Sequence, residues 1–148
     1  MTTPVVIKGK NCKLYYNSGT YASPTWVEVK NVKDLTLTLT YDEAEVSTRG
    51  GGKQYEPTLL DSQIEFEMVR DTADSVQTAL LAAFENQTVL DLAVAEGAIA
   101  TNGTKYYRDD YKIFSSPHNE ALADVKRIPL TFKPCYSENA SGFFTVSA

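Results

Sequence analysis

The side chains that could carry nucleophilic or acid–base chemistry are few and widely spaced. His118 is the only histidine, and it lies in the turn-like stretch SSPHNE, where a surface histidine is expected rather than a general base. Cys12 and Cys135 lie near opposite ends of the chain, and neither stands in a catalytic or metal-binding motif. Without a recognisable export signal, both thiols are expected to be reduced and unbridged. We predict no catalytic, cofactor-binding or metal-binding residues.

Acidic side chains offer a second kind of chemistry, that of paired carboxylates. Asp42, Glu43 and Glu45 lie together in one segment, and Asp109 and Asp110 in another. Two convergent carboxylates can act as acid and base on a glycosidic bond. Charged loop residues are far more often solvated than catalytic, so we predict that the protein is not an enzyme.

Three consecutive glycines, Gly50, Gly51 and Gly52, stand between Arg49 and Lys53. The run is similar in composition to a phosphate-binding loop, but no Gly-Lys-Ser/Thr follows and no helix begins there. We predict instead the tip of a long loop over residues 41–59, in which the glycines allow bending and the two cations meet an acidic surface. Loops longer than the usual median of about 4–6 residues are usually functional or disordered.

Length and composition indicate one domain over residues 1–148, with short flexible segments at 1–10 and 137–148. The net charge is −5, with 14 basic and 19 acidic residues, and the basic residues are not clustered. A grip on DNA phosphates needs clustered Lys and Arg, so specific DNA binding is not expected. No secretory signal or apolar run of about 20 residues is apparent, and no membrane association is predicted.

The candidate residues lie in or beside segments whose sequence patterns predict β-strands. Runs at 13–16 and 26–30 flank a turn-rich stretch and predict a hairpin. Alternation in 34–41 and 63–69 predicts two strands, each with one buried and one wet face. The predicted core-facing residues are Leu35, Leu37, Leu39, Tyr41, Ile64, Phe66 and Met68. The predicted wet residues are Thr36, Thr38, Thr40, Gln63, Glu65 and Glu67.

One helix interrupts the strands, at about 75–86. Val76, Leu80, Ala83 and Phe84 form its apolar stripe, and its start can be capped by Asp71, Thr72 and Asp74. Strands are expected at 88–95 and 105–115, joined through Asn102-Gly103, a pair typical of a type I′ turn.

A last alternating strand carries Ile128, Leu130 and Phe132 on one face. Pro129 lies within it and indicates an edge, a bulge or a join between subunits, because proline has no amide for the ladder. The fold class predicted is mainly β, a β-sandwich or partly closed barrel with one flanking α-helix.

The aromatic residues Tyr15, Tyr16, Tyr106, Tyr107 and Tyr111 permit two interpretations. They could form a face that stacks on sugar rings, as in a carbohydrate-binding β-sandwich module. Aromatic residues are enriched in strands in any case, and we favour that interpretation.

The order of these parts resembles the major tail tube proteins of long-tailed (siphovirus-like) bacteriophages. The phrases that carry the resemblance are WVEVKNVKDLTLTLTYDEAEVSTRGGGKQYEPTLLDSQIEFEM, then the helix, then ADVKRIPLTFKP. Together they cover roughly residues 11–136. Two stretches depart from the family pattern, a Gly/Ala-rich hairpin region at 96–104 and the short tail SENASGFFTVSA.

The resemblance implies a structural virion protein that assembles into hexameric rings, stacked as a tail tube through which DNA passes without specific binding. It implies tape-measure, tail-tip and tail-terminator partners, and assembly in the bacterial host cytoplasm. It also implies that the 41–59 loop reaches the neighbouring ring. The inter-ring residues would be Asp42, Glu43, Glu45, Arg49, Gly50, Gly51, Gly52 and Lys53. The wet residues Thr36, Thr38, Thr40, Gln63, Glu65 and Glu67 would face the lumen.

Two alternatives stay open. A tube protein of a contractile tail, or of a related secretion or injection device, shares the architecture. A carbohydrate-binding module belongs to a different class and predicts a monomer that binds a glycan.

Overall fold

The computed structural model of the chain describes residues 6–30 and 32–147. Residues 1–5 of the predicted N-terminal segment, together with Asn31 and Ala148, lie outside the described residues. The elements in order are η1 (Gly9–Asn11), β1 (Lys13–Asn17), β2 (Trp26–Glu28), β3 (Val32–Glu45), β4 (Tyr55–Val69), α1 (Ser75–Asn86), β5 (Leu90–Ala95), β6 (Lys105–Ser115), β7 (Arg127–Pro134) and β8 (Gly142–Thr145).

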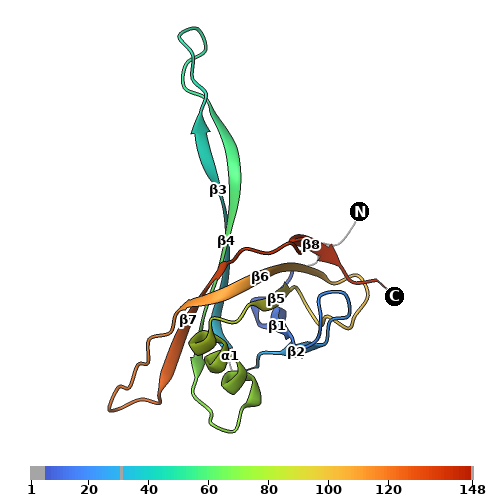
Figure 1. The fold of residues 1–148 in the computed structure, drawn as a ribbon, viewed down its shortest axis with the longest axis vertical. Helices are drawn as coiled ribbons and strands as arrows, with labels where there is room; N and C mark the ends of the chain where they lie inside the picture. The colour runs from blue at the N-terminus through green and yellow to red at the C-terminus, as the bar shows by residue number, and fades with distance from the viewer. Residues whose placement is uncertain (1–5, 31, 148) are drawn as a thin grey trace.

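The described strands form one eight-stranded antiparallel sheet in the order β2-β1-β5-β6-β7-β4-β3. One edge of β6 pairs with β5, and the other is shared by β8 near Tyr106 and by β7 near Tyr111. The sheet is not closed, because β2 and β3 at its two ends do not pair with each other. The predicted mainly β fold with one flanking helix is confirmed (Figure 1).

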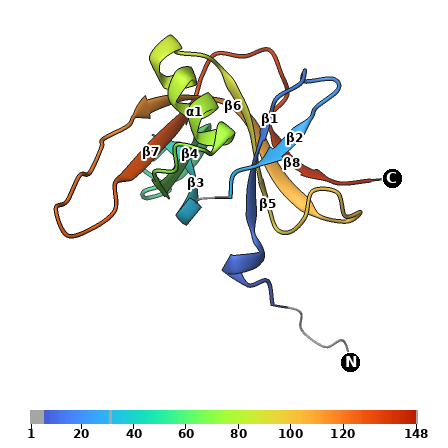
Figure 2. The ribbon, with the colours of Figure 1, turned by 90° about the horizontal axis from the view of Figure 1, so that it is seen from below.

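The hydrophobic core lies on the concave face of the sheet. Figure 2 shows β3, β4 and β7 on one side, β1, β2 and β5 on the other, and α1 between them. Ile64, Phe66 and Met68 of β4 are at most 3% exposed, as their alternation predicted. Phe66 stacks on Phe132 of β7, with ring centres 5.3 Å apart. Burying each such side chain contributes about 1.5–3 kcal/mol, which makes this face the main source of stability.

Helix α1 begins and ends where the sequence predicts. Asp74 is the N-cap, and its Oδ1 accepts a hydrogen bond from the Val76 amide at 2.9 Å. Val76, Leu80 and Ala83 are buried in the core cluster. Phe84, predicted on the same stripe, is 37% exposed, because the helix packs with a narrower face than the i, i+4, i+7, i+8 pattern assumed.

A bulge near the start of β3 sets which residues face the core. Lys33 pairs with Glu67 but Thr36 pairs with Glu65, so β3 carries one extra residue there. Asp34 has φ 55°, a left-handed conformation that asparagine, aspartate and glycine tolerate best. The extra residue allows Val32 to pack against the core along with Leu35 and Leu37.

The connection between β5 and β6 differs from the turn that the sequence predicts. β5 and β6 form the predicted hairpin, in which Gly103 has φ 89°. Asn102 does not have positive φ, so the turn is not type I′, and residues 96–104 form a longer connection.

Pro129 is opposite Glu67 of β4 but lies beyond the end of β6, where Ser115 pairs with Thr131. It therefore occupies a local edge, one of the positions predicted for it.

The convex face of the sheet carries a second, smaller cluster. Tyr15, Ala93 and Ala95 are buried there against Trp26 and Tyr106. The predicted flexible tail, 137–148, contains β8, which pairs with β6. No helix in the described part of the chain is long and apolar enough to cross a membrane.

Candidate functional site

A two-stranded ribbon projects from the body of the molecule (Figure 1). β7 pairs with β4 only from Ile64 onward, so the more distal parts of β3 and β4 pair with each other alone among the described strands. We call residues 39–61 the arm. The predicted loop over 41–59 is wrong, since β3 continues to Glu45 and β4 begins at Tyr55. Only residues 46–54 form the turn at the tip.

Hydrogen bonds close the base of the turn at the tip, and the residues at its end are exposed. The Gln54 amide donates to Ser47 Oγ at 2.9 Å, and the Val46 amide donates to the Gln54 carbonyl at 2.9 Å. Of the predicted inter-ring residues, the tip holds Arg49, Gly50, Gly51, Gly52 and Lys53, all exposed. Gly52 has φ 72°, which explains the need for glycine at this position. Asp42, Glu43 and Glu45 lie in the strand of the arm rather than in a loop.

The arm exposes apolar side chains that sequence reasoning placed in the core. Leu39 is 38% and Tyr41 55% exposed, so their predicted burial is wrong for a single chain. Tyr41 pairs with Leu60, itself 44% exposed, on the same face as the core-facing pair Leu37 and Ile64. The hydrophobic face of the sheet thus continues onto the arm, where nothing in the described chain covers it.

The opposite face of β3 and β4 brings the predicted wet residues together. Thr36 pairs with Glu65, and Thr38 with Gln63, so their side chains share one face. Thr36, Thr38, Thr40 and Glu65 are exposed, while Gln63 and Glu67 are half-buried. Glu67 is 3.2 Å from Arg127 Nη1 in an ion pair. This face is polar and bears carboxylates, as the alternation predicted.

The residues considered for catalysis are not assembled into a site. His118 is exposed in the connection between β6 and β7, and both cysteines are free. Burial, with the nearby Asp110 charge, raises the pKa of the Cys135 thiol, which disfavours the nucleophilic thiolate. Within residues 6–30 and 32–147, no group of three or more histidine, cysteine or acidic side chains could hold a metal ion.

Asp109 and Asp110 are adjacent on β6 and therefore point to opposite faces of the sheet. Asp110 accepts hydrogen bonds from Ser137 and, at 2.8 Å, from Asn139. Burial raises the pKa of Asp109, although the Asp110 amide donates to its Oδ1 at 2.7 Å. The two carboxylates do not converge on a substrate position.

The five tyrosines considered for sugar binding are buried or half-buried. Tyr15, Tyr107 and Tyr111 are at most 7% exposed, and the Tyr111 hydroxyl lies 2.9 Å from Ser62 Oγ in the interior. Tyr106 is half-buried between Trp26 and Phe144. The interpretation of these aromatics as strand residues matches their positions.

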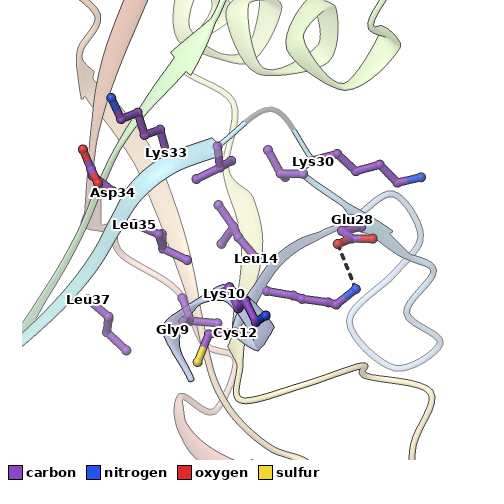
Figure 3. Close-up of a pocket in the computed structure, with 14 residues that line it drawn as sticks. Gly9, Lys10, Cys12, Leu14, Glu28, Lys30, Lys33, Asp34, Leu35 and Leu37 are labelled. Carbon is purple, nitrogen blue, oxygen red and sulfur yellow. Dashed lines mark ion pairs between the residues drawn. The ribbon is translucent and has the colours of Figure 1, made fainter. Parts of the chain in front are cut away.

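A groove of about 740 Å³ lies between the two ends of the open sheet, which sequence reasoning did not predict. Figure 3 shows β3 along one side of this groove and the η1–β1 segment along the other. Its floor is apolar and includes Leu14, Val29, Leu35, Leu37 and Val94. Its charged lining residues are Lys10, Lys13, Lys30, Lys33, Glu28 and Asp34.

The charges around the groove are unequally paired. Lys13 Nζ is 3.2 Å from Glu28 Oε1, the ion pair drawn in Figure 3. Lys10, Lys30 and Lys33 are exposed and form no ion pair with any described residue. Four lysines against two carboxylates leave the groove positively charged in a protein whose net charge is −5.

Chains from solved tail tubes have a similar fold. The chain is similar over 95% of its length to a subunit of the SPP1 tail tube, with a TM-score of 0.74 and 13% identity, covering 80% of that chain. It is similar over 93% of its length to a chain from the tail of an empty gene transfer agent (GTA) particle, resolved with C6 symmetry. That TM-score is 0.70 at 13% identity, covering 98% of that chain.

Contractile systems share the fold as well. A chain of the PVC sheath–tube complex, from an extracellular contractile injection system, matches 95% of this chain and 93% of its own, with a TM-score of 0.62 and 12% identity. No protein-family model matches the sequence, and comparison with curated proteins finds no match. The likeness in fold to the SPP1 and GTA tail chains confirms the predicted resemblance to tail tube proteins.

Proposed function

We propose that this protein is a structural, non-enzymatic component of a phage tail, in which hexameric rings of the chain stack into the tube that carries DNA. The observation that carries the proposal is the arm. It continues the apolar face of the sheet into solvent, which a monomeric protein has no reason to maintain. The likeness to tail tube subunits over almost the whole chain supports it.

The proposed roles of the arm and of the polar face follow from this assembly. The tip residues Arg49 to Lys53, with Asp42, Glu43 and Glu45 behind them, contact the neighbouring ring. The polar face bearing Thr36, Thr38, Thr40, Gln63, Glu65 and Glu67 lines the lumen. Carboxylates on that wall repel phosphates, so DNA slides through without being held.

The tube belongs to the tail of the virion and assembles in the host cytoplasm. Its ends meet tape-measure, tail-tip and tail-terminator proteins. Chains of similar fold occur in the anti-feeding prophage (AFP) baseplate and in the PVC sheath/tube terminator, which supports end-capping partners of this kind here.

A tube of a contractile tail or injection device is the second candidate, and the likeness to chains of the PVC sheath–tube complex and of the AFP baseplate favours it. Those TM-scores, 0.60–0.63, are lower than the 0.67–0.74 of the SPP1 and GTA tails. We therefore favour the non-contractile tube. Co-purification of a sheath protein from infected cells would reverse this choice.

Negative-stain electron microscopy of the purified protein over a range of concentrations tests the proposal. Rings or hollow tubes are expected to form as the concentration rises. Monomers at every concentration, together with retention on a glycan array, would contradict the proposal and favour the carbohydrate-binding module.

A further inference from the structure

The arm and the groove have complementary properties, although the arm extends away from the groove along β3. The groove has an apolar floor and three lysines with no ion-pair partner in the described chain. The arm has exposed apolar residues beside exposed carboxylates. We propose that the lysine-lined groove of one copy receives the arm of a second copy, an inference that rests on the proposed tube assembly.

Charge is the first reason to choose the arm as occupant. Residues 39–61 contain five acidic side chains, Asp42, Glu43, Glu45, Glu56 and Asp61, against Arg49 and Lys53 at the tip. All of these side chains are exposed. The arm has a net charge of −3 and the groove a net charge of +2, so the two attract each other. This attraction also orients the two molecules as they approach.

Apolar contact is the second reason. Leu39, Tyr41 and Leu60 lie on the face that continues the core, and they are 38%, 55% and 44% exposed. The groove floor between Leu14 and Leu35 is apolar, and a volume of about 740 Å³ has room for several side chains. Docking would remove both apolar surfaces from water at once.

The occupant must come from another molecule. β3 itself lines the groove with Leu35 and Leu37, and the arm extends away from it along the same strand. At about 3.3 Å per residue, Glu43 lies about 20 Å along the strand from Leu37 and cannot fold back without breaking the ladder with β4. An arm and a groove on each copy give a head-to-tail contact, the kind that closes into rings or propagates as filaments.

A native thiol allows a direct test. Cys12 lines the groove and is free. In a Cys135→Ser background, we would introduce Tyr41→Cys, Glu43→Cys or Glu45→Cys singly, oxidise the assembled protein and run non-reducing gels. At least one variant is expected to give a ladder of multiples of 16.3 kDa. Thr40→Cys, on the opposite face of the same strand, is the matched control and is expected to give no ladder.

Charge reversal supplies a second measurement that does not depend on thiol geometry. A groove variant carries Lys10→Glu, Lys30→Glu and Lys33→Glu, and an arm variant carries Glu43→Lys and Glu45→Lys, which share the face of Tyr41. Each alone is expected to need at least about tenfold higher concentration to assemble, because like charges then face each other. A mixture of the two is expected to assemble as the parent does, since every arm meets an oppositely charged groove.

The outcomes separate this inference from the proposed function. The arm-in-groove contact would be wrong if the cysteine variants form tubes without any cross-link and the charge-reversed variants assemble as the parent does. The proposed tube function would then still stand. A parent protein that stays monomeric at every concentration and is retained on a glycan array would overturn both.

Discussion

Arg108 on β6 donates from Nε to both carboxylate oxygens of Asp91 on β5, each at 3.0 Å, while its guanidinium carbon lies 4.0 Å from the ring centre of Tyr21. The side chains of Arg108 and Asp91 are only 9% and 12% exposed. Burial opposes the charge of Arg108, but the hydrogen bond and the charge of Asp91 raise its pKa. The pair ties the turn-rich 18–25 connection to the convex face of the sheet.

Breaking this pair should be costly. Arg108→Met is expected to lower the free energy of unfolding of the unassembled chain by about 3 kcal/mol, because the variant leaves a nearly buried carboxylate without its cationic partner and with only the hydrogen bond from Asn17. Denaturant unfolding measures the change. Lys126→Met, which removes a surface ion pair with Glu120, is the control and should cost at most about 1 kcal/mol. Equal stability of the two variants would contradict the buried role of Arg108.

Asp109 should make stability depend on pH. Its folded pKa is raised above the ordinary value of 3.8, mainly by burial, so the protonated form is favoured in the folded state. The stability that this group contributes is present below pH 3.8 and is lost as pH rises through the folded pKa. Asp109→Asn keeps the acceptor for the Asp110 amide and removes the charge. The variant should melt at higher temperature than the parent at pH 7, and the difference should shrink below pH 4.

The bulge at Asp34 can be tested by its backbone. Because φ is 55°, Asp34→Ala is expected to cost about 1 kcal/mol, whereas Asp34→Gly should change stability little or increase it. Thermal or denaturant unfolding of the two variants decides this. An alanine variant as stable as the glycine variant would mean that the left-handed conformation is not imposed at this position.

The polar face is tested best at Glu65. Its carboxylate is exposed and accepts a hydrogen bond from Gln63, whereas Glu67 is engaged by Arg127 and would lose an ion pair on substitution. If this face lines the channel, Glu65→Lys should leave tubes intact and slow or block DNA ejection from particles, because lysines attract phosphates. Glu65→Gln is the control, with ejection close to the parent rate. Normal ejection from the lysine variant would place this face elsewhere.

The tip can be shortened without disturbing the strands, since Ser47 and Gln54 are already hydrogen-bonded. Replacing residues 48–53 with Asn-Gly, a two-residue hairpin turn, should leave a folded domain but prevent long tubes. A six-residue Gly/Ser replacement keeps the length and removes Arg49 and Lys53. Circular dichroism checks folding and electron microscopy measures tube length. Tubes of normal length from the shortened variant would move the ring-to-ring contact to another segment.

Periodicity predicted the elements that have one face in the core. The bounds of α1 and β6 match those expected, because buried residues recur in each at the spacing of its element. The arm was not predicted, because this kind of periodicity is missing from it. Its residues have no buried face in a single chain, so no alternation distinguishes Asp42 and Glu43 from loop residues. β8 was missed because only four residues, in a segment rich in Ser, Asn and Gly, form it.

The groove and the Arg108–Asp91 pair depend on tertiary contacts. The groove is built from η1, β1, the residues after β2 and the bulged start of β3, which are separated in sequence. No local pattern marks Lys10 and Lys33 as facing one cavity. Arg108 and Asp91 resemble ordinary wet residues of their strands until the 18–25 connection covers them.

β4 runs unbroken from Tyr55 at the tip of the arm to Val69 beside the turn that leads into α1. At about 3.3 Å per residue its fifteen residues span roughly 50 Å, and its buried residues, Ser62, Ile64, Phe66 and Met68, all lie in the half nearer the body. β4 therefore connects the tip to the core through a single strand. Docking of the arm on a second copy should reduce the local opening of β4 in the core. Amide hydrogen exchange at Ile64 and Phe66 should therefore slow when the protein assembles, although neither residue touches the tip.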